Sequence, residues 1–300
     1  MTEHLVSVAS PGQHELAEGP RWDDVTGTVS WVDIVAGLVL RGVVDADGVH
    51  ETQRLDFPDT VGAASPSHDG GLVVAAHDAV VHVAADGRRR RVANLLDRSQ
   101  RLRLNDAAVD PAGRLLAGSL ATDHREGAAT LWRVEPDGAT AVLRGGLNLA
   151  NGIGWSPDGT VLYLADSVPG TLWAAAYDVP SGATSDWTPL VTTFTGLPDG
   201  LCVDSAGRIW VAEWNGSRVS CFSPSGELVD EVSLPVPHVT AVAFVGPARD
   251  RLLITSARDE LDAEARARFP LSGRLFLADV GARGLPTNRF GPLSETLEMP

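Results

Sequence analysis

A repeat of just over 40 residues limits what this chain can fold into. Short β-rich segments of similar pattern, such as TVSWVDI, VLYLADS and RIWVAEW, are centred on Trp31, Val74, Leu116, Leu164, Val211 and Ile254, at spacings of 42 to 48 residues. Repeats of about this length are typical of propellers, in which every unit is a four-stranded sheet. Six such units are visible along the chain.

The stretch from 197 to 234 shows the strands of one unit most clearly. Its strand-like pieces are LCVD, RIWVAEW, RVSCFSP and ELVDEVSL, separated by Ser205-Ala206-Gly207, Asn215-Gly216 and Ser225-Gly226. Glycine supplies the positive φ angles that tight hairpin turns need, so these gaps indicate antiparallel strands joined in order. The polar segment Pro198-Asp199-Gly200 stands just ahead of the first strand. The sequence thus predicts an all-β, six-bladed β-propeller of four-stranded antiparallel blades.

The sixth repeat lacks its outer strand. The chain ends in RFGPLSETLEMP, where Pro292 and Pro300 argue against a strand, whereas HLVSVA at residues 4–9 precedes the first repeat. We expect this N-terminal segment to pair with the blade that contains Arg274–Val280, because closing the ring removes a free sheet edge. Residues 1–300 would then form a single domain.

The composition limits which binding partners and which cellular compartment are expected for this protein. The net charge is −15, and all 24 basic residues are arginine, which disfavours nucleic acid and anionic membranes as partners. The one basic run, Arg88–Arg91, falls on an expected outer strand and is interpreted as a solvated edge rather than a binding patch. No segment approaches the roughly 18 apolar residues of a membrane span, and the N-terminus lacks the pattern of a secretion signal. We expect a cytoplasmic monomer or weak homo-oligomer.

The two cysteines are not expected to form a disulfide. Cys202 and Cys221 fall on the first and third strands of one predicted blade. Two interstrand spacings of about 4.8 Å each separate such strands, which is too far for a disulfide. Two cysteines cannot form a structural zinc site either.

Polar residues stand at equivalent places at the start of several innermost strands. Glu18, Asn105, Asn151 and Asp199 precede the turn glycines of their repeats by eight or nine positions. Innermost strands line the channel of a propeller, so these side chains should face one another. Two carboxylates crowded there need a cation, and an all-oxygen set suits a hard divalent ion. The alternative is that each residue only caps a strand or satisfies a turn amide.

Several segments resemble one known family. LAEGPRWD, RLNDAAVDPAGRLLAGS, NGIGWSPDGTVLYLADS, LPDGLCVDSAGRIWVAEWNG and LLITSARDELDAEA are similar, in this order, to the senescence marker protein/gluconolactonase/luciferin-regenerating-enzyme family, and the similarity spans nearly the whole chain. The resemblance implies a six-bladed propeller that holds one divalent ion, most often Ca²⁺, with Mg²⁺, Mn²⁺ or Zn²⁺ as alternatives.

The resemblance also assigns residues. It implies that Glu18 in AEGP, Asn151 in NGIGW and Asp199 in PDGL hold the metal, and that Arg103 and Asn105 in RLND contact the substrate. A further acidic contact of the family, a glutamate in the regucalcin pattern, falls at Asp123 in SLATD. Aspartate is one methylene shorter, so the shape of the sugar pocket around this position is expected to differ.

The expected activity is hydrolysis of a small sugar-acid lactone to the open-chain acid. Asp199 is the candidate general base, and a role as ligand alone is the alternative. The chain has no G-x-S-x-G, G-x-x-x-x-G-K or H-E-x-x-H motif. A calcium- or ligand-binding propeller without turnover, and a hydrolase of another ester or phosphoester, remain open. His124 and His238 lie where a pocket role is conceivable, but surface or packing roles are favoured.

Overall fold

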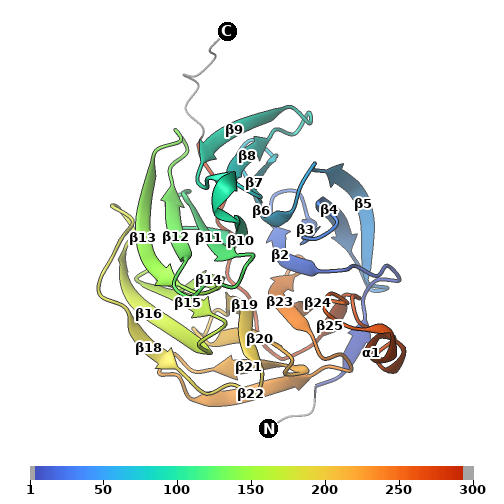
Figure 1. The fold of residues 1–300 in the computed structure, drawn as a ribbon. Coiled ribbons are helices and arrows are strands. Elements are labelled where there is room, and N and C mark those ends of the chain that lie inside the picture. Colours follow the sequence, from blue (N-terminus) through green and yellow to red (C-terminus); the bar gives the residue numbers. More distant parts are fainter. Residues whose placement is uncertain (1–3, 293–300) are drawn as a thin grey trace.

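Six antiparallel sheets surround a central channel in the computed structural model, which describes residues 4–292 of the chain (Figure 1). The first blade contains β2 (Ala17–Asp23), β3 (Thr28–Asp33), β4 (Leu38–Val44) and β5 (Val49–Asp56), and the second contains β6 (Val61–Pro66), β7 (Leu72–Ala76), β8 (Ala79–Val83) and β9 (Arg89–Asn94). The third follows a 3₁₀ turn, η1 (Arg98–Gln100), and contains β10 (Leu102–Val109), β11 (Leu115–Ala121), β12 (Ala129–Val134) and β13 (Thr140–Leu147). The predicted six-bladed β-propeller is confirmed.

The fourth, fifth and sixth blades have the same antiparallel arrangement with small differences. The fourth contains β14 (Ala150–Trp155), β15 (Val161–Asp166), β16 (Thr171–Asp178), the short β17 (Ala183–Thr184) and β18 (Thr188–Val191), and the fifth contains β19 (Leu197–Val203), β20 (Ile209–Trp214), β21 (Arg218–Phe222) and β22 (Leu228–Ser233). The sixth contains β23 (Val239–Val245), β24 (Arg251–Ser256), β25 (Phe276–Ala278) and β1 (Val6–Val8), with the helix α1 (Ala263–Arg268) between β24 and β25. The sequence reasoning had no expectation of α1.

The N-terminal strand closes the ring. Strand β1 pairs antiparallel with β25, with Val6 opposite Ala278 and Val8 opposite Phe276. The predicted pairing is confirmed, and the edge that β25 would otherwise expose is covered. Part of the C-terminal stretch predicted not to form a strand, residues 293–300, lies outside the described residues.

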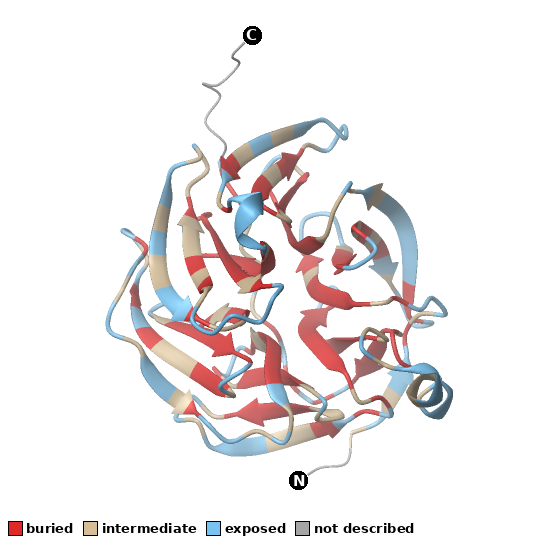
Figure 2. Cartoon of the chain, viewed as in Figure 1, coloured by how far each residue is buried: buried red, intermediate tan, exposed pale blue. Residues whose placement is uncertain are grey.

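The apolar core lies between neighbouring blades. Inner and middle strands are buried, and outer strands such as β5 are largely exposed (Figure 2). Trp210 of the fifth blade meets Phe244 of the sixth edge to face, with ring centroids 6.1 Å apart. Cys202 and Cys221 are free thiols, as predicted. Within residues 4–292, no helix has the length and apolar character needed to cross a membrane.

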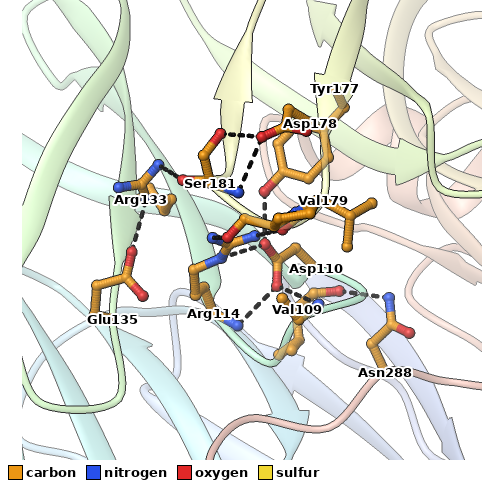
Figure 3. Close-up of polar contacts among 12 residues, drawn as sticks. Val109, Asp110, Arg114, Arg133, Glu135, Tyr177, Asp178, Val179, Ser181 and Asn288 are labelled. Atoms are coloured by element: carbon orange, nitrogen blue, oxygen red, sulfur yellow. Dashed lines mark hydrogen bonds and ion pairs between the residues drawn. The ribbon is translucent and has the colours of Figure 1, made fainter.

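A buried aspartate joins the third blade to the fourth (Figure 3). Asp110, in the turn after β10, accepts hydrogen bonds from Arg114 Nε at 2.6 Å and from the Tyr177 hydroxyl of β16 at 2.6 Å. The turn DPAGR recurs in the fifth blade as DSAGR, where Asp204 accepts from Arg208 Nε at 2.7 Å. These carboxylates fix the ends of the inner strands and so hold their side chains in register.

The segment after β25 closes one end of the channel. Arg283 accepts a hydrogen bond from Ser205 N at 2.7 Å, and Asn288 donates to Val109 O at 3.0 Å. Phe290 is fully buried between the second and third blades. This segment therefore crosses the ends of the inner strands, opposite the end where those strands begin.

Candidate functional site

Every inner strand is interrupted near its start by an irregularity in its pairing with the next strand. The register shifts lie between Glu18 and Arg21, Val61 and Ala63, Leu104 and Ala107, Asn151 and Ile153, Pro198 and Leu201, and Val239 and Val242. A bulge turns the neighbouring side chains away from the regular alternation. In four blades it does so beside a residue predicted for the site.

Glycine makes one of these bulges possible. Gly152 has a φ of +34°, and a Cβ on it would lie 2.5 Å from Asp199 O. The chain after Asn151 therefore approaches the strand that carries Asp199 more closely than any side chain would permit. Strand β19 begins at Leu197, so Pro198-Asp199-Gly200 belongs to the strand and its bulge rather than standing ahead of it.

Asn105 and Asn151 are joined directly, although they come from different blades. Asn105 Nδ2 donates to Asn151 Oδ1 at 2.6 Å, and Asn151 Nδ2 donates to Ser167 Oγ at 3.0 Å. Ser167 in turn donates to Pro198 O at 2.7 Å. These bonds fix the orientation of the Asn151 amide: its oxygen points toward Asn105 and its nitrogen points toward Ser167.

Two buried carboxyl groups meet in the channel. Glu18 and Asp199 are 6% and 5% exposed and lie within hydrogen-bonding reach of each other. Burial, together with the nearby Asp106 carboxylate, raises the pKa of Glu18 to about 8. Burial and the Glu18 carboxylate raise the pKa of Asp199 well above its usual range. Asp199 Oδ1 is buried without a hydrogen-bond partner among the residues that the structure describes.

Arg103 faces this pair from the third blade. Burial lowers the pKa of its guanidinium to about 10, although the carboxylates of Glu18 and Asp199 oppose that shift. The group therefore stays charged at neutral pH. Its Nη1 donates to Asn105 Oδ1 at 2.8 Å and to Leu104 O at 3.1 Å. Within residues 4–292 its Nη2 and Nε have no hydrogen-bond acceptor, so they remain available to a ligand.

The sequence reasoning missed a second charged pair beneath the carboxyls. Arg21 Nη2 of the first blade lies 3.3 Å from Asp106 Oδ1 of the third, and Asp106 is 5% exposed with its pKa raised by burial. Both residues stood in segments quoted for the resemblance, EGPRW and RLND. Their contact joins blades that are not neighbours, which no local pattern could reveal.

The strands that carry Glu18, Asn151 and Asp199 share an anchoring device. Asp33, Asp166 and Glu213, near the ends of β3, β15 and β20, accept the backbone N–H groups of Leu16 at 3.2 Å, Leu149 at 3.0 Å and Gly196 at 2.7 Å. Each anchored amide lies two or three residues before the predicted ligand. Charge-assisted bonds of this kind hold the start of each inner strand.

The other predicted positions lie elsewhere. Asp123 is in the exposed loop after β11, paired with Arg125 Nε at 2.9 Å, and the structure does not join it to the buried cluster. His124 is exposed in the same loop. His238 is buried, stacked on Trp214 with ring centroids 3.9 Å apart, which agrees with a packing role.

The cluster fits a hard divalent ion. Its donors are carboxylate and carboxamide oxygens, and residues 4–292 contain no group of three His, Cys, Asp or Glu placed to bind a metal. The site therefore relies on the Asn151 oxygen beside two carboxylates. The raised pKa values of Glu18 and Asp199 show that the protein itself does not stabilise their ionised forms, which a bound cation would favour, and Asp199 Oδ1 has no partner among the described residues.

A separate cavity lies further along the inner strands. A cavity of about 340 Å³ is lined by later residues of the same inner strands, such as Trp22, Ile153 and Leu201, and by the C-terminal segment at Leu285. Its lining is mostly apolar and does not include the carboxyl pair. We assign the candidate site to Glu18 and Asp199 because their carboxyl groups are buried together with raised pKa values, and not because of cavity volume.

Sequence and structure comparisons identify the family of this chain. The family model described as SMP-30/Gluconolactonase/LRE-like region matches residues 16–258. Pentonolactonase XacC of Haloferax volcanii is 34% identical, over 91% of this chain and 94% of its own. A 6-deoxy-6-sulfogluconolactonase of Pseudomonas putida is 33% identical, over 90% and 92%. A crystal structure of regucalcin from Agrobacterium tumefaciens, described as a calcium-binding protein, is 26% identical with a TM-score of 0.90, over 96% and 98%. The chain belongs to the SMP-30/gluconolactonase/LRE-like family.

Proposed function

We propose that this protein hydrolyses a small sugar-acid lactone to the open-chain aldonic acid with the help of one divalent ion, with Ca²⁺ as the first candidate. The observation that carries the proposal is the meeting of Glu18 and Asp199 beside Asn151, with the Arg103 guanidinium facing them. Relatives named pentonolactonase and 6-deoxy-6-sulfogluconolactonase support this substrate class.

Glu18, Asn151 and Asp199 are the residues that would hold the ion. When bound, the ion would supply a Lewis acid that polarises the lactone carbonyl and stabilises negative charge on its oxygen. Neutralising the carboxylates would also keep Asp199 ionised near neutral pH, because an opposite charge favours the charged form of an acid.

The protein side chains would carry out proton transfer and orient the substrate. Asp199 takes a proton from the attacking water, for which its unpartnered Oδ1 is free. The water oxygen bonds to the carbonyl carbon, the acyl C–O bond of the ring breaks, and the ring oxygen leaves as an alkoxide that takes the proton held by Asp199 and becomes a hydroxyl. Arg103 and Asn105 orient substrate oxygens, since Arg103 keeps donors without a protein acceptor among the described residues.

A calcium-binding protein without turnover is the second candidate, favoured by the likeness to a regucalcin described as calcium-binding. Storage of an ion requires the carboxylates and Asn151 but gives no role to Arg103. The half-buried cation held 2.8 Å from Asn105 Oδ1 favours an enzyme for polar, hydroxylated substrates. Hydrolysis of another ester or phosphoester is tested by the same experiment.

The experiment is a pH-indicator assay on a panel of aldonolactones, with an aryl ester and an aryl phosphate as comparison substrates. Wild-type protein should hydrolyse one or more lactones in the presence of Ca²⁺, Mg²⁺, Mn²⁺ or Zn²⁺, and Arg103→Gln should raise KM. Tight Ca²⁺ binding without turnover of any lactone would support the storage protein instead. Cytoplasmic residence, a single domain over residues 1–300, a monomeric or weakly associating state and the substrate contact at Asp123 stay predictions.

A further inference from the structure

Three arginines gather around a cavity on the second blade. The cavity has a volume of about 260 Å³, and its lining includes Phe57, His77, Val81, Arg89, Arg91 and Arg98. It shares no lining residue with the carboxyl pair of the candidate lactone site. The chain as a whole has a net charge of −15, whereas this lining holds three arginines and two aspartates.

The arginine run Arg88–Arg91 contributes through one side of its strand only. Side chains alternate along β9, so Arg89 and Arg91 line the cavity, whereas Arg90 does not. Arg89 lies over the Phe57 ring, 4.3 Å from its centroid. The expectation that the whole run is a solvated edge is therefore incomplete, because two of its members share a defined concave surface.

The two aspartates in the lining are already engaged. Arg98 donates to Asp59 Oδ2 at 3.1 Å and to Asp78 Oδ1 at 2.8 Å, and Asp59 also lies 3.1 Å from the His77 ring. Arg91 Nη1 forms an ion pair with Asp78 Oδ2 at 3.7 Å, too long for a hydrogen bond, and donates instead to Asn94 Oδ1 at 2.5 Å. Arg98 thus pairs with both carboxylates of the lining.

Arg89 has no such carboxylate. Its guanidinium contacts the Phe57 ring, and no acidic group lies within 4.0 Å of it anywhere in residues 4–292. A guanidinium stacked on an aromatic face keeps its N–H edge free, because only the flat face is used in the stack. Arg89 therefore offers planar donors that no protein acceptor uses, and Arg91 adds its Nη2 and Nε, which have no acceptor among the described residues.

We propose that this cavity binds a small molecule that carries a phosphate or sulfonate group. Arginine forks match the oxygens of such groups, and two forks on one strand side can bind a tetrahedral anion from two directions. A volume of about 260 Å³ exceeds that of the anion itself, so Phe57 and Val81 are left to contact an organic portion. The site is independent of the proposed lactonase activity.

The test uses the full-length, metal-loaded protein with sulfate and methyl phosphate as probes, titrated by calorimetry at constant ionic strength set with NaCl. Wild type should bind both probes with one site. The double variant Arg89→Gln/Arg91→Gln should bind at least about tenfold more weakly, because each lost charge-assisted bond alone can account for such a factor. Arg90→Gln, the matched control on the other side of β9, should bind like wild type.

The same variants separate this site from the candidate lactone site. Lactone hydrolysis should be unchanged in the double variant, and an Asp199→Asn variant should bind sulfate as wild type does. Equal weakening in Arg90→Gln and in the double variant would show a diffuse charge effect and overturn the proposal. Loss of sulfate binding in Asp199→Asn, or absence of binding in wild type, would overturn it as well. Cosedimentation with phosphatidylglycerol vesicles, abolished in the double variant, would replace the small molecule by a lipid surface.

Discussion

Asn105 Nδ2 donates a hydrogen bond to Asn151 Oδ1 at 2.6 Å, which joins a side chain proposed to contact the substrate to one proposed to hold the ion. A carboxamide oxygen has two lone pairs, so Asn151 can accept this bond and still offer a second pair to a cation. The bond to Ser167 holds the same amide from its other end. The two functions are thus adjacent but separable.

Replacing Asn105 should affect the substrate more than the ion. In Asn105→Ala, we expect KM to rise or kcat/KM to fall, because a donor beside the lactone is lost. Asn151 keeps its bond to Ser167, so the affinity for the metal should change by no more than about tenfold, the scale of one ordinary hydrogen bond. Metal titration and lactone kinetics on the same preparation provide the check. A much larger loss of metal binding would move Asn105 among the metal ligands.

Ser167 should position the Asn151 oxygen without touching substrate. It is 4% exposed and accepts from Asn151 while donating to Pro198 O. Ser167→Ala leaves the Asn151 amide free to rotate, so the metal Kd should rise about 10- to 100-fold, with kcat largely recovered at saturating metal. Ser65→Ala is the control, because Ser65 is equally buried but its hydroxyl has no partner among the described residues. Equal metal affinities in the two variants would refute the positioning role.

The lowered pKa of Asp33 predicts how the free energy of unfolding changes with pH. Burial alone would raise its pKa, but bonds from His14 and from the amides of Leu16 and Glu15 hold the pKa below its usual value. A depressed folded-state pKa stabilises the protein above the unfolded value, near pH 4, and this contribution is lost as pH falls through the folded value. Asp33→Asn should cost about 1.5–3 kcal/mol of unfolding free energy at pH 7 and much less near pH 2.

Denaturant unfolding of both proteins at several pH values measures that difference. Asp56→Asn, at an exposed carboxylate at the end of β5, is the control and should change stability by less than about 0.5 kcal/mol. A deficit in Asp33→Asn that stays constant from pH 7 to pH 2 would show that the charge of Asp33 has no part in holding the strand that leads to Glu18.

Asp199→Asn separates a general base from a ligand. Asparagine keeps an oxygen of the same size but cannot accept a proton, so kcat at saturating metal should fall by about 10²- to 10⁴-fold. Asn151→Asp adds negative charge instead; it should bind the ion more tightly and lose less activity. If Asp199→Asn keeps near wild-type kcat once metal is saturating, Asp199 is only a ligand and another group accepts the proton.

The repeat explains why so much of the fold could be predicted. Strand patterns and turn glycines are local, and their period places the inner strand starts of Glu18, Asn151 and Asp199 around one axis. The missing outer strand of the sixth blade left one place for β1, and the pairing of Val6 with Ala278 fills it.

What sequence reasoning missed depends on contacts that cross the channel or interrupt the repeat. The Arg21–Asp106 pair joins the first blade to the third, and no spacing along the chain encodes that distance. Helix α1 interrupts the last repeat after its N-cap residue, Asp262. The repeat pattern predicts only strands and turns, so it did not predict this helix. The position of Asp123 depends on a loop, and loops follow no period.

Lactone hydrolysis at Glu18, Asn151 and Asp199 is proposed to require one bound divalent ion. The most direct measurement is the rate of lactone hydrolysis by wild-type protein after exhaustive EDTA treatment, with metal content determined, followed by stepwise return of a divalent ion. We predict that activity is lost when the ion is removed and is fully recovered at one equivalent per chain. Full activity in protein that contains no metal would contradict it.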